Sequence, residues 1–295
     1  MNKTYLGYLL TMLSALAFAS MSLFIKLGYG IGMNAWNFSL INSSFSLILM
    51  GVLLVREPKV KRSRVSPLTL ILFVLTGAAA AIAFNVALAY LSISLATILL
   101  FTYPAFTALG AWAVLGQLPW RSHLIALAMT LAGAVLTANI SDLRSGAVSL
   151  LGVALALGAA VSHGFYIVLG EKIAGGLSAI GATALTRVAI LSGTILLYPR
   201  VFAELPGVPW QGWLICLASA LVAGVAPFLF LNRGIALIGA NRAAIASVAE
   251  LPFALALGML FQGDVVRLWQ GLGALLIVVA VVVSQQQQST PTEGA

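Results

Sequence analysis

The sequence predicts an all-α membrane protein in which ten transmembrane helices form two inverted five-helix repeats around a central cavity. The first observation is composition: 61% of the 295 residues are hydrophobic and 7% are charged, whereas a soluble domain carries about 25% charged residues. The second is that the apolar residues form runs of about the 20 residues that a helix needs to cross a bilayer. The third is that features of the first half return in the second half.

The composition also excludes several classes of protein. The mean hydropathy of +1.08 is too high for a soluble globular enzyme or a disordered chain. One cysteine, Cys216, allows no internal disulfide, and with two histidines in the chain we expect no metal site and no cofactor. The net charge of +8 does not indicate nucleic-acid binding, because the basic residues lie between apolar runs, as in membrane proteins with several spans.

The apolar runs are continuous and rich in Leu, Ala and Gly, which favours helices over the alternating strands of a membrane β-barrel. The first run is too long for a signal peptide and lacks a clear cleavage site, so it is taken as the first transmembrane helix. The polar segment 285–295 is predicted to be a disordered cytoplasmic tail. The ten runs are 6–25, 36–55, 67–90, 93–115, 123–140, 147–169, 179–198, 209–231, 243–261 and 266–284.

The distribution of Lys and Arg predicts the orientation, because cytoplasmic loops carry more of them. With both termini inside, ten of the 15 basic residues lie in cytoplasmic segments and four lie outside. The loop 56–66 alone contributes five of the ten. We therefore expect both termini to be cytoplasmic.

Five helices in each half are predicted by a repeat with a nearly constant offset of 145 to 148 residues. The segment from Pro104 to Gly110 matches the segment from Pro252 to Gly258 at Pro, Ala, Leu and Gly. The predicted units are 1–141 and 142–284. Because five is odd, the second unit must have inverted topology, and inverted repeats with a site near the midplane are typical of secondary transporters that work by alternating access.

These features resemble the EamA-like branch of the drug/metabolite transporter superfamily. The matching segments are the Pro-x-x-x-Ala-Leu-Gly of each half, followed by Gly116-Gln117 and Gly263-Asp264, and Gly133 in the fifth helix. The family pattern has Glu in those Gly-Glu pairs and often an Arg in the second helix, where this chain has Asn42 in the first half and Arg187 in the second.

The resemblance is greatest to bacterial exporters of aromatic amino acids. It implies export of aromatic and other neutral amino acids across the bacterial inner membrane, with the fifth and tenth helices at the periphery. It implies a small-molecule substrate, a lipid bilayer and no nucleic acid as partners, with a monomer as the working expectation. Export of cationic drugs or other metabolites is the alternative within the superfamily.

Three ionisable residues lie within the apolar runs, where charge is costly and each such group suggests a function. His163 is expected to sense protons, to bind substrate or to bond a neighbouring Ser. Arg187 is expected to extend its side chain toward the membrane surface, to form a structural pair or to bind a substrate carboxylate. Glu250 is expected to hold an amine, to pair with Arg187 or to carry a proton.

Further candidates come from the repeat and from aromatic residues. Pro104 and Pro252 interrupt the fourth and ninth helices and are predicted to be hinges or plain packing kinks. Asn42 and Asn85 are candidate substrate or coupling residues. The repeat pairs Asn85 with Asn232, and a helix-to-helix hydrogen bond is the alternative for this pair. Tyr103 is expected to line a substrate pocket or to pack in the helix core.

Two other functional classes, a membrane-embedded enzyme and a channel, have little support in the sequence. A membrane-embedded lipid-modifying enzyme needs clustered carboxylates, His pairs or metal ligands near the interface, and the sequence shows no such cluster. A channel needs a ring of like charges or a carbonyl filter, and nothing in the sequence resembles either one. The chain also lacks a Gly-x-x-x-x-Gly-Lys-Ser/Thr segment, so it is not expected to hydrolyse ATP.

Overall fold

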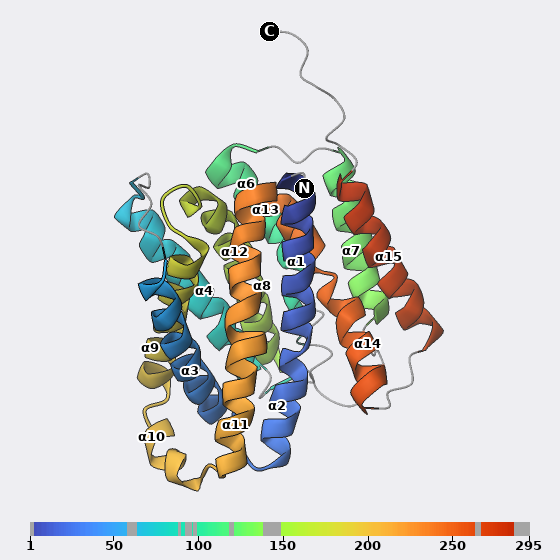
Figure 1. Ribbon diagram of the computed structural model, residues 1–295. Helices are drawn as coiled ribbons and strands as arrows, with labels where there is room; N and C mark the ends of the chain where they lie inside the picture. Colours follow the sequence, from blue (N-terminus) through green and yellow to red (C-terminus); the bar gives the residue numbers. More distant parts are fainter. Residues whose placement is uncertain are drawn as a thin grey trace.

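The computed structural model describes residues 3–57, 64–87, 90–91, 96, 99–117, 121–137, 149–262 and 267–285. In these ranges the regular structure is helical, and the helices form a bundle (Figure 1). The predicted tail beyond 285 and the Gly263-Asp264 pair lie outside the described residues. The first six helices are α1 (Lys3–Ala19), α2 (Met21–Gly30), α3 (Ala35–Val55), α4 (Pro67–Ala87), α6 (Tyr103–Leu115) and α7 (Arg121–Thr137).

The second part of the chain begins with two long helices and continues with several interrupted ones. They are α8 (Leu150–Ile173), α9 (Ala179–Leu197), α10 (Val201–Glu204), the 3-10 turn η2 (Leu205–Gly207), α11 (Trp210–Ser219), the π-helix η3 (Ala220–Val225), α12 (Ala226–Ile238), α13 (Ala240–Ser247), α14 (Glu250–Gln262) and α15 (Leu268–Gln285).

Within the described residues, six helices or continuous helix series are long and apolar enough to cross a membrane. Large apolar side chains cover the outside of the bundle; Val55, Leu150 and Leu196 are 88%, 85% and 80% exposed. Such a surface is suited to lipid rather than water. The spans are Lys3–Gly30, Ala35–Val55, Pro67–Ala87, Leu150–Ile173, Ala179–Leu197 and Trp210–Ile238. The remaining apolar helices in the described residues are shorter.

Local chemistry defines the starts of several helices. The Asn34 side chain accepts hydrogen bonds from the backbone N–H groups of Trp36 and Asn37 at 3.0 and 2.9 Å. Ser149 and Ser178 cap α8 and α9 in the same way, by accepting from Gly152 and Gly181. These caps satisfy N–H groups that the first turn of a helix leaves without an intrahelical partner.

Several predicted runs are interrupted where the sequence suggested continuous helices. The first is divided at Ser20, whose hydroxyl donates to the carbonyl of Ala17 at 2.7 Å, a bond that competes with the helix backbone. The fourth has a turn at 101–102 before α6. The eighth contains the π-helix η3, which ends two residues before Pro227, a residue that has no N–H to donate. The ninth is divided into α13 and α14 at Val248 and Ala249.

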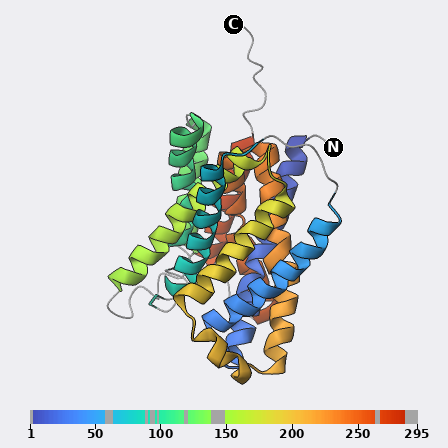
Figure 2. The ribbon, with the colours of Figure 1, turned by 90° about the vertical axis from the view of Figure 1, so that its left-hand side faces the viewer.

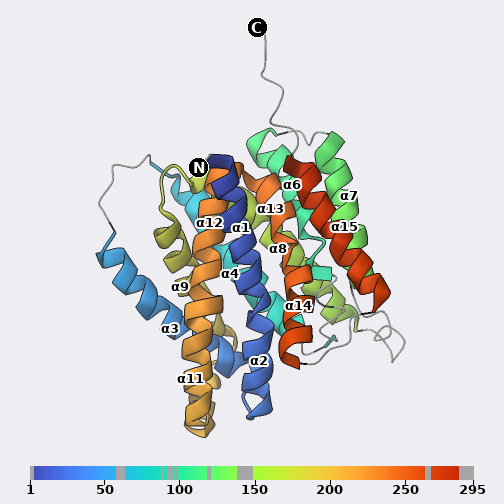
Figure 3. The same ribbon diagram turned by 45° about the vertical axis from the view of Figure 1, so that its right-hand side comes forward.

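The packing joins segments that are distant in sequence. α4 packs on α8, α1 on α12, and α3 on α9, and Figure 2 shows α3 and α9 running side by side at a slant to the bundle. α7 and α15 pack against each other at one side of the bundle (Figures 1 and 3). This pair is peripheral, as the resemblance implies for the fifth and tenth helices.

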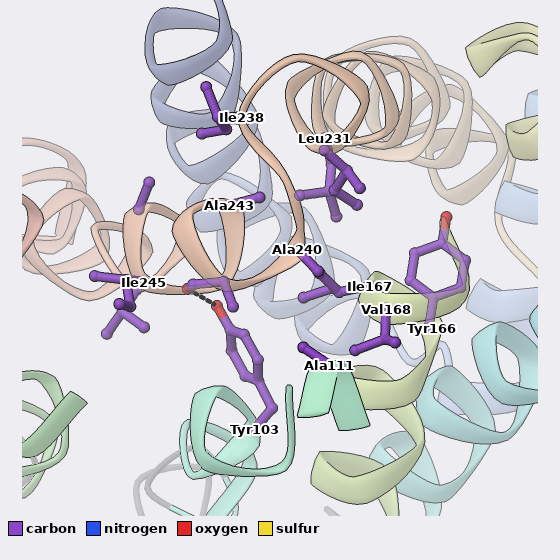
Figure 4. Packing of buried hydrophobic residues seen from close by; sticks show 14 of the residues in the cluster. Tyr103, Ala111, Tyr166, Ile167, Val168, Leu231, Ile238, Ala240, Ala243 and Ile245 are labelled. Atoms are coloured by element: carbon purple, nitrogen blue, oxygen red, sulfur yellow. Dashed lines mark hydrogen bonds between the residues drawn. The ribbon is translucent and has the colours of Figure 1, made fainter. Parts of the chain in front are cut away.

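A close approach of α6 and α8 positions the central residues. A Cβ atom added at Gly164 would lie 2.9 Å from the backbone N of Thr107 and 3.0 Å from the carbonyl oxygen of Tyr103. Only glycine allows this contact, which brings the start of α6 against the middle of α8. Tyr103 and Tyr166 thereby join the buried core shown in Figure 4.

Candidate functional site

A row of aromatic rings crosses the interior of the bundle between α6, α8 and α12. The ring of Tyr103 meets that of His163 edge-on, with 4.7 Å between centroids. His163 stacks on Tyr166 at 6.1 Å, and Tyr166 meets Phe228 edge-on at 6.3 Å. We call these four residues the aromatic row. Such ring contacts each stabilise by about 0.5–1.5 kcal/mol beyond area burial.

Arg187, on α9, lies at the Phe228 end of the row. Its guanidinium carbon is 4.3 Å from the Phe228 ring centroid, which is cation–π geometry. Its Nη2 group donates a hydrogen bond to the carbonyl of Gly224 in the π-helix, while its Nε has no hydrogen-bond partner among the residues that the structure describes. The side chain is 4% exposed, so the interpretation that it extends to the membrane surface is wrong: the π-helix carbonyl and the Phe228 ring hold it inside.

Glu250 and Tyr103 lie at the other end of the row. The Tyr103 hydroxyl donates to the carbonyl of Ala244 at 3.1 Å and so joins α6 to α13 (Figure 4). Glu250, the first residue of α14, is close enough to Tyr103 for electrostatic interaction. In the part of the chain that the structure describes, no ion pair joins Glu250 to Arg187, whose electrostatic partner is Tyr166. The suggested pairing of these two residues is therefore wrong for this structure.

Asn42 lies close to the Arg187 end of the row. Its Nδ2 donates to the Ser219 hydroxyl at 2.9 Å, and its Oδ1 is 3.3 Å from where a Cβ on Gly224 would lie. Asn42 and Arg187 thus both reach the same turn of the π-helix, from α3 and α9. A second arginine in place of Asn42 would bring two positive charges to this buried turn.

Asn85 differs from its repeat counterpart, Asn232. Asn85 is half-buried on α4, whereas Asn232 accepts a hydrogen bond from the Tyr166 hydroxyl at 3.3 Å and donates to Thr183 at 3.2 Å. The repeat identified both amides, but the structure assigns the contact with the aromatic row to Asn232. Phe228 was also missed; its position directly after Pro227 is the sequence signal that marks it.

The two repeat prolines lie in the first turns of helices. Pro104 is the second residue of α6, and Pro252 is the third residue of α14. Each follows a break in an apolar run, so the prolines separate short helical segments and do not kink continuous helices. A first turn tolerates proline because its N–H groups have no intrahelical acceptor.

No group of three or more His, Cys, Asp or Glu side chains able to hold a metal occurs among the described residues. The groups at and beside the aromatic row are the Arg187 guanidinium, the Glu250 carboxyl, the His163 imidazole and the faces of the aromatic rings. This set can bind an organic ion through charge, ring stacking and hydrogen bonds.

Polar clusters link helices at both ends of the bundle. At one end, Glu204 accepts hydrogen bonds from the Tyr198 hydroxyl and from Asn34 Nδ2, both at 2.6 Å. These bonds lower the pKa of Glu204 and raise the pKa of Tyr198. At the other end, Glu171 accepts from Gln117 Nε2 at 2.6 Å and from the backbone N–H of Ala240.

Two segments of the sequence each match the model of the same protein family. The model of the EamA-like transporter family covers residues 5–139 and again residues 150–285. The chain belongs to the EamA-like transporter family. The two matched segments together include nearly all of the residues that form the aromatic row and its surroundings.

A relative and a solved structure are consistent with this membership. An uncharacterized transporter of Synechocystis is 28% identical over 214 residues, which is 70% of this chain and 64% of that protein. The chain thus matches slightly less than two thirds of the relative's length. A solved crystal structure superimposes with a TM-score of 0.76 at 15% identity, covering 95% of this chain and 96% of the other. At this identity the likeness shows a shared fold alone.

Proposed function

We propose that this EamA-family chain is a secondary transporter that exports small metabolites, namely aromatic and other neutral amino acids, by alternating access. The observation that carries the proposal is Arg187, at one end of the aromatic row: a buried guanidinium whose Nε has no hydrogen-bond partner within the described part of the chain. An unpaired buried donor is costly, and a substrate carboxylate would satisfy it. The neighbouring rings would hold an aromatic or apolar side chain.

The architecture in this proposal has two inverted repeats, 1–141 and 142–284, with ten spans. The two matches of the family model support it. The helix contacts also support it, because exchanging the halves converts one contact into another: α4 on α8 becomes α12 on α1. The pairs α3 with α9 and α7 with α15 exchange with themselves. This is the pattern that a two-fold axis in the membrane plane produces.

In this mechanism the remaining candidates have separate roles. His163 and Glu250 are proposed to carry or sense protons. Tyr103 is proposed to influence both, because its ring contacts that of His163 and it interacts electrostatically with Glu250. Asn42 holds the π-helix next to Arg187 through Ser219. Asn85 is proposed to contact substrate in another state of the cycle. Pro104 and Pro252 are proposed hinges, because each begins a helix directly after a break.

The proposed location is the bacterial inner membrane, with both termini in the cytoplasm. The higher density of Lys and Arg in the segments at that end supports the orientation. A monomer is the proposed unit.

A second candidate function is the export of organic cations. The half-buried Glu250, which interacts electrostatically with Tyr103, favours it, because a carboxyl near an aromatic ring suits a cation. A flux assay in proteoliposomes distinguishes the two candidate functions, since transport of an organic cation would need Glu250 and not Arg187. Membership in a transporter family does not favour the lipid-modifying enzyme.

The test is flux from proteoliposomes loaded with labelled aromatic, neutral and charged amino acids, with and without a pH gradient. Saturable release of aromatic or neutral types, stimulated or unchanged by the gradient, is the expected result. Release of organic cations alone would favour the second candidate. If folded protein released neither class, the proposed substrate class would be wrong.

A further inference from the structure

One carboxylate joins three helices at the end of the bundle that holds the N-terminus, where α6 and α13 lie in Figure 1. Glu171, half-buried near the end of α8, accepts a hydrogen bond at 2.6 Å from Nε2 of Gln117, which follows α6. Its second oxygen, Oε2, accepts from the backbone N–H of Ala240, the first residue of α13. Because Gln117 belongs to the first half of the chain, this carboxylate connects the two halves.

Two glycines determine where the donors of these hydrogen bonds lie. Gly116 ends α6 with a left-handed φ of +68°, and the N–H groups of Gly116 and Gln117 bond back to carbonyls in the last turns of α6, a common helix ending. Gly239 turns the chain from α12 into α13 at a φ of +80°, and a Cβ there would lie 3.2 Å from Glu171 Oε2. The carboxylate also suits the partial positive charge at the start of α13.

The contact of this carboxylate with Gln117 is the last of a series along α6 and α8. At Gly164, next to His163 of the aromatic row, an added Cβ would lie 2.9 Å from the backbone of α6. Closer to the end of the bundle, a Cβ on Gly110 would lie 3.2 Å from a methyl group of Val168. α6 and α8 therefore pack closely from the aromatic row to this end of the bundle, and the carboxylate holds the outer end of their contact.

This polar contact differs from the apolar core around it. Gln117 is exposed and Glu171 is half-buried, so water can replace each of them as the partner of the other when the bond breaks. Ala240 is fully buried, and water that enters between separating helices can take the place of Glu171 as acceptor for its N–H. The contact can thus open without leaving a buried polar group unsatisfied, as a gate requires.

We propose that Glu171 is the latch of a gate at this end of the bundle. It holds α6, α8 and α13 together while the aromatic row is closed to this side, and its bonds to Gln117 and Ala240 break when the row opens to it. The inference rests on the proposed function, because a gate has a role only in a protein that alternates between two accessible states. In the proposed orientation this is the cytoplasmic gate.

The first test is the rate at which a maleimide labels a Val168→Cys variant in detergent. Val168 is fully buried and lies between the aromatic row and the latch, so its replacement becomes reactive only when α6 and α8 separate. Cysteine is close to valine in size, which limits the disturbance of the core. The native Cys216 is also fully buried, and the protein without the added cysteine gives the background.

Gln117→Glu should raise the labelling rate about tenfold or more, because it replaces a charge-assisted hydrogen bond with repulsion between two carboxylates. Adding Glu171→Gln to Gln117→Glu should restore slow labelling, since an amide at 171 can donate to residue 117 and still accept from Ala240. Lys172→Gln, at the exposed next position, changes the charge by the same amount and should leave the rate unchanged. Thermal unfolding midpoints show whether each variant is folded.

The second test locks the latch. Gln117→Cys combined with Glu171→Cys is joined by a short bifunctional methanethiosulfonate reagent in proteoliposomes. We expect the cross-link to stop flux and a reductant to restore it, because a gate that cannot open prevents the cycle. Each single variant, treated with the same reagent, should keep the flux that it had before treatment.

The outcomes separate the latch from the proposed function. Slow labelling in folded Gln117→Glu protein, or fast labelling that persists when Glu171→Gln is added, would overturn the latch. Flux that continues with the cross-link in place would also overturn it while retaining the proposed function. Fast labelling of Gln117→Glu, reversed by Glu171→Gln, without amino-acid flux in any of these proteins would retain the latch and reject amino acids as the substrate.

Discussion

At the scale of single residues, the charged groups within the apolar helices have different surroundings. Arg187 is fully enclosed by the Phe228 ring, the Gly224 carbonyl and Tyr166. Glu250 lies by Tyr103 at the other end of the aromatic row. Since the two do not pair, each is available for a ligand group of opposite charge. An Arg187–Glu250 pair would have neutralised both.

We predict that Arg187→Gln raises the KM for an aromatic amino acid about tenfold, a loss of about 1.4 kcal/mol of binding free energy. The substitution removes the cation–π contact and the charged donor for a carboxylate. Arg187→Lys keeps the positive charge but lacks the planar guanidinium that can donate two parallel hydrogen bonds to a carboxylate, so it should have an intermediate effect. The measurement is flux in proteoliposomes as a function of substrate concentration.

The control for this prediction is Arg121→Gln, which removes an exposed positive charge and should leave KM unchanged. Thermal unfolding in detergent separates binding from folding, because Arg187→Gln also leaves the Gly224 carbonyl without its donor. An unchanged KM in folded Arg187→Gln protein would show that Arg187 has a structural role only.

At the scale of elements, glycines and breaks determine how closely the helices approach. Gly164 lets α6 lie against α8, and Gly77 lets α4 approach Tyr166 and Thr186, where an added Cβ would lie 2.8 and 2.9 Å from side-chain carbons. The π-helix η3 presents the Gly224 carbonyl to Arg187. These features bring the aromatic row together from three helices.

We predict that Gly164→Ala destabilises the protein by about 1–3 kcal/mol, since the added methyl group would overlap the backbone of α6. Displacement of α6 would also move Tyr103 away from His163 and reduce flux. Gly158→Ala, in the same helix α8, is the matched control. No atom lies within 4 Å of a Cβ there, so this variant should be neutral or stabilised by up to about 1 kcal/mol. Equal unfolding midpoints for both variants would refute the close-contact explanation.

At the scale of the whole molecule, polar clusters join the two halves of the chain at both ends of the bundle. Glu204 links α10 to Asn34 at the start of α3 and to Tyr198 at the end of α9. Trp36 stacks on Tyr198 at 5.1 Å between centroids. At the opposite end, Glu57 and Ser178 join the other ends of α3 and α9. The α3–α9 pair is therefore held at both of its ends.

We predict that the Glu204 cluster makes stability depend on pH. Its hydrogen bonds, first that from Tyr198, lower the pKa of Glu204 in the folded protein. The resulting stabilisation is present above the unfolded-state pKa of about 4.3 and is lost as pH falls through the lower folded-state pKa. The difference in unfolding midpoint between the unchanged protein and Glu204→Gln should thus shrink between pH 6 and pH 3, to be followed by thermal scans. A difference that is constant with pH would contradict the prediction.

We also predict the side of the membrane on which each end of the bundle lies. With the N-terminus in the cytoplasm, a membrane-impermeant maleimide added to spheroplasts should label Gly207→Cys and should not label Lys172→Cys. Both positions are exposed, and Cys216 is buried. Labelling of Lys172→Cys before permeabilisation, with Gly207→Cys protected, would reverse the orientation.

The sequence indicated the candidate residues of the site better than it indicated their partners. An ionisable side chain in an apolar run is conspicuous, so Arg187, His163 and Glu250 could be selected from the sequence. Asn232 could be identified only as the repeat counterpart of Asn85, and the sequence marks Phe228 only by its place after Pro227, because aromatic and amide residues occur throughout the chain. The Arg187–Gly224 bond depends on a π-helix that the hydropathy of 209–231 does not reveal.

The sequence by itself determined that the chain is helical and lies in a membrane, because hydropathy and length alone decide whether a segment can cross a bilayer. Its motifs also indicated the transporter family to which it belongs. The tertiary structure decided which helices pair, where the runs break and which side chains point inward. The physical reason is that most positions on every side of these helices are apolar, so hydropathy alone does not mark the inner face, even though α3 and α9 bury several polar side chains there. Close packing and a few buried hydrogen bonds make that selection instead.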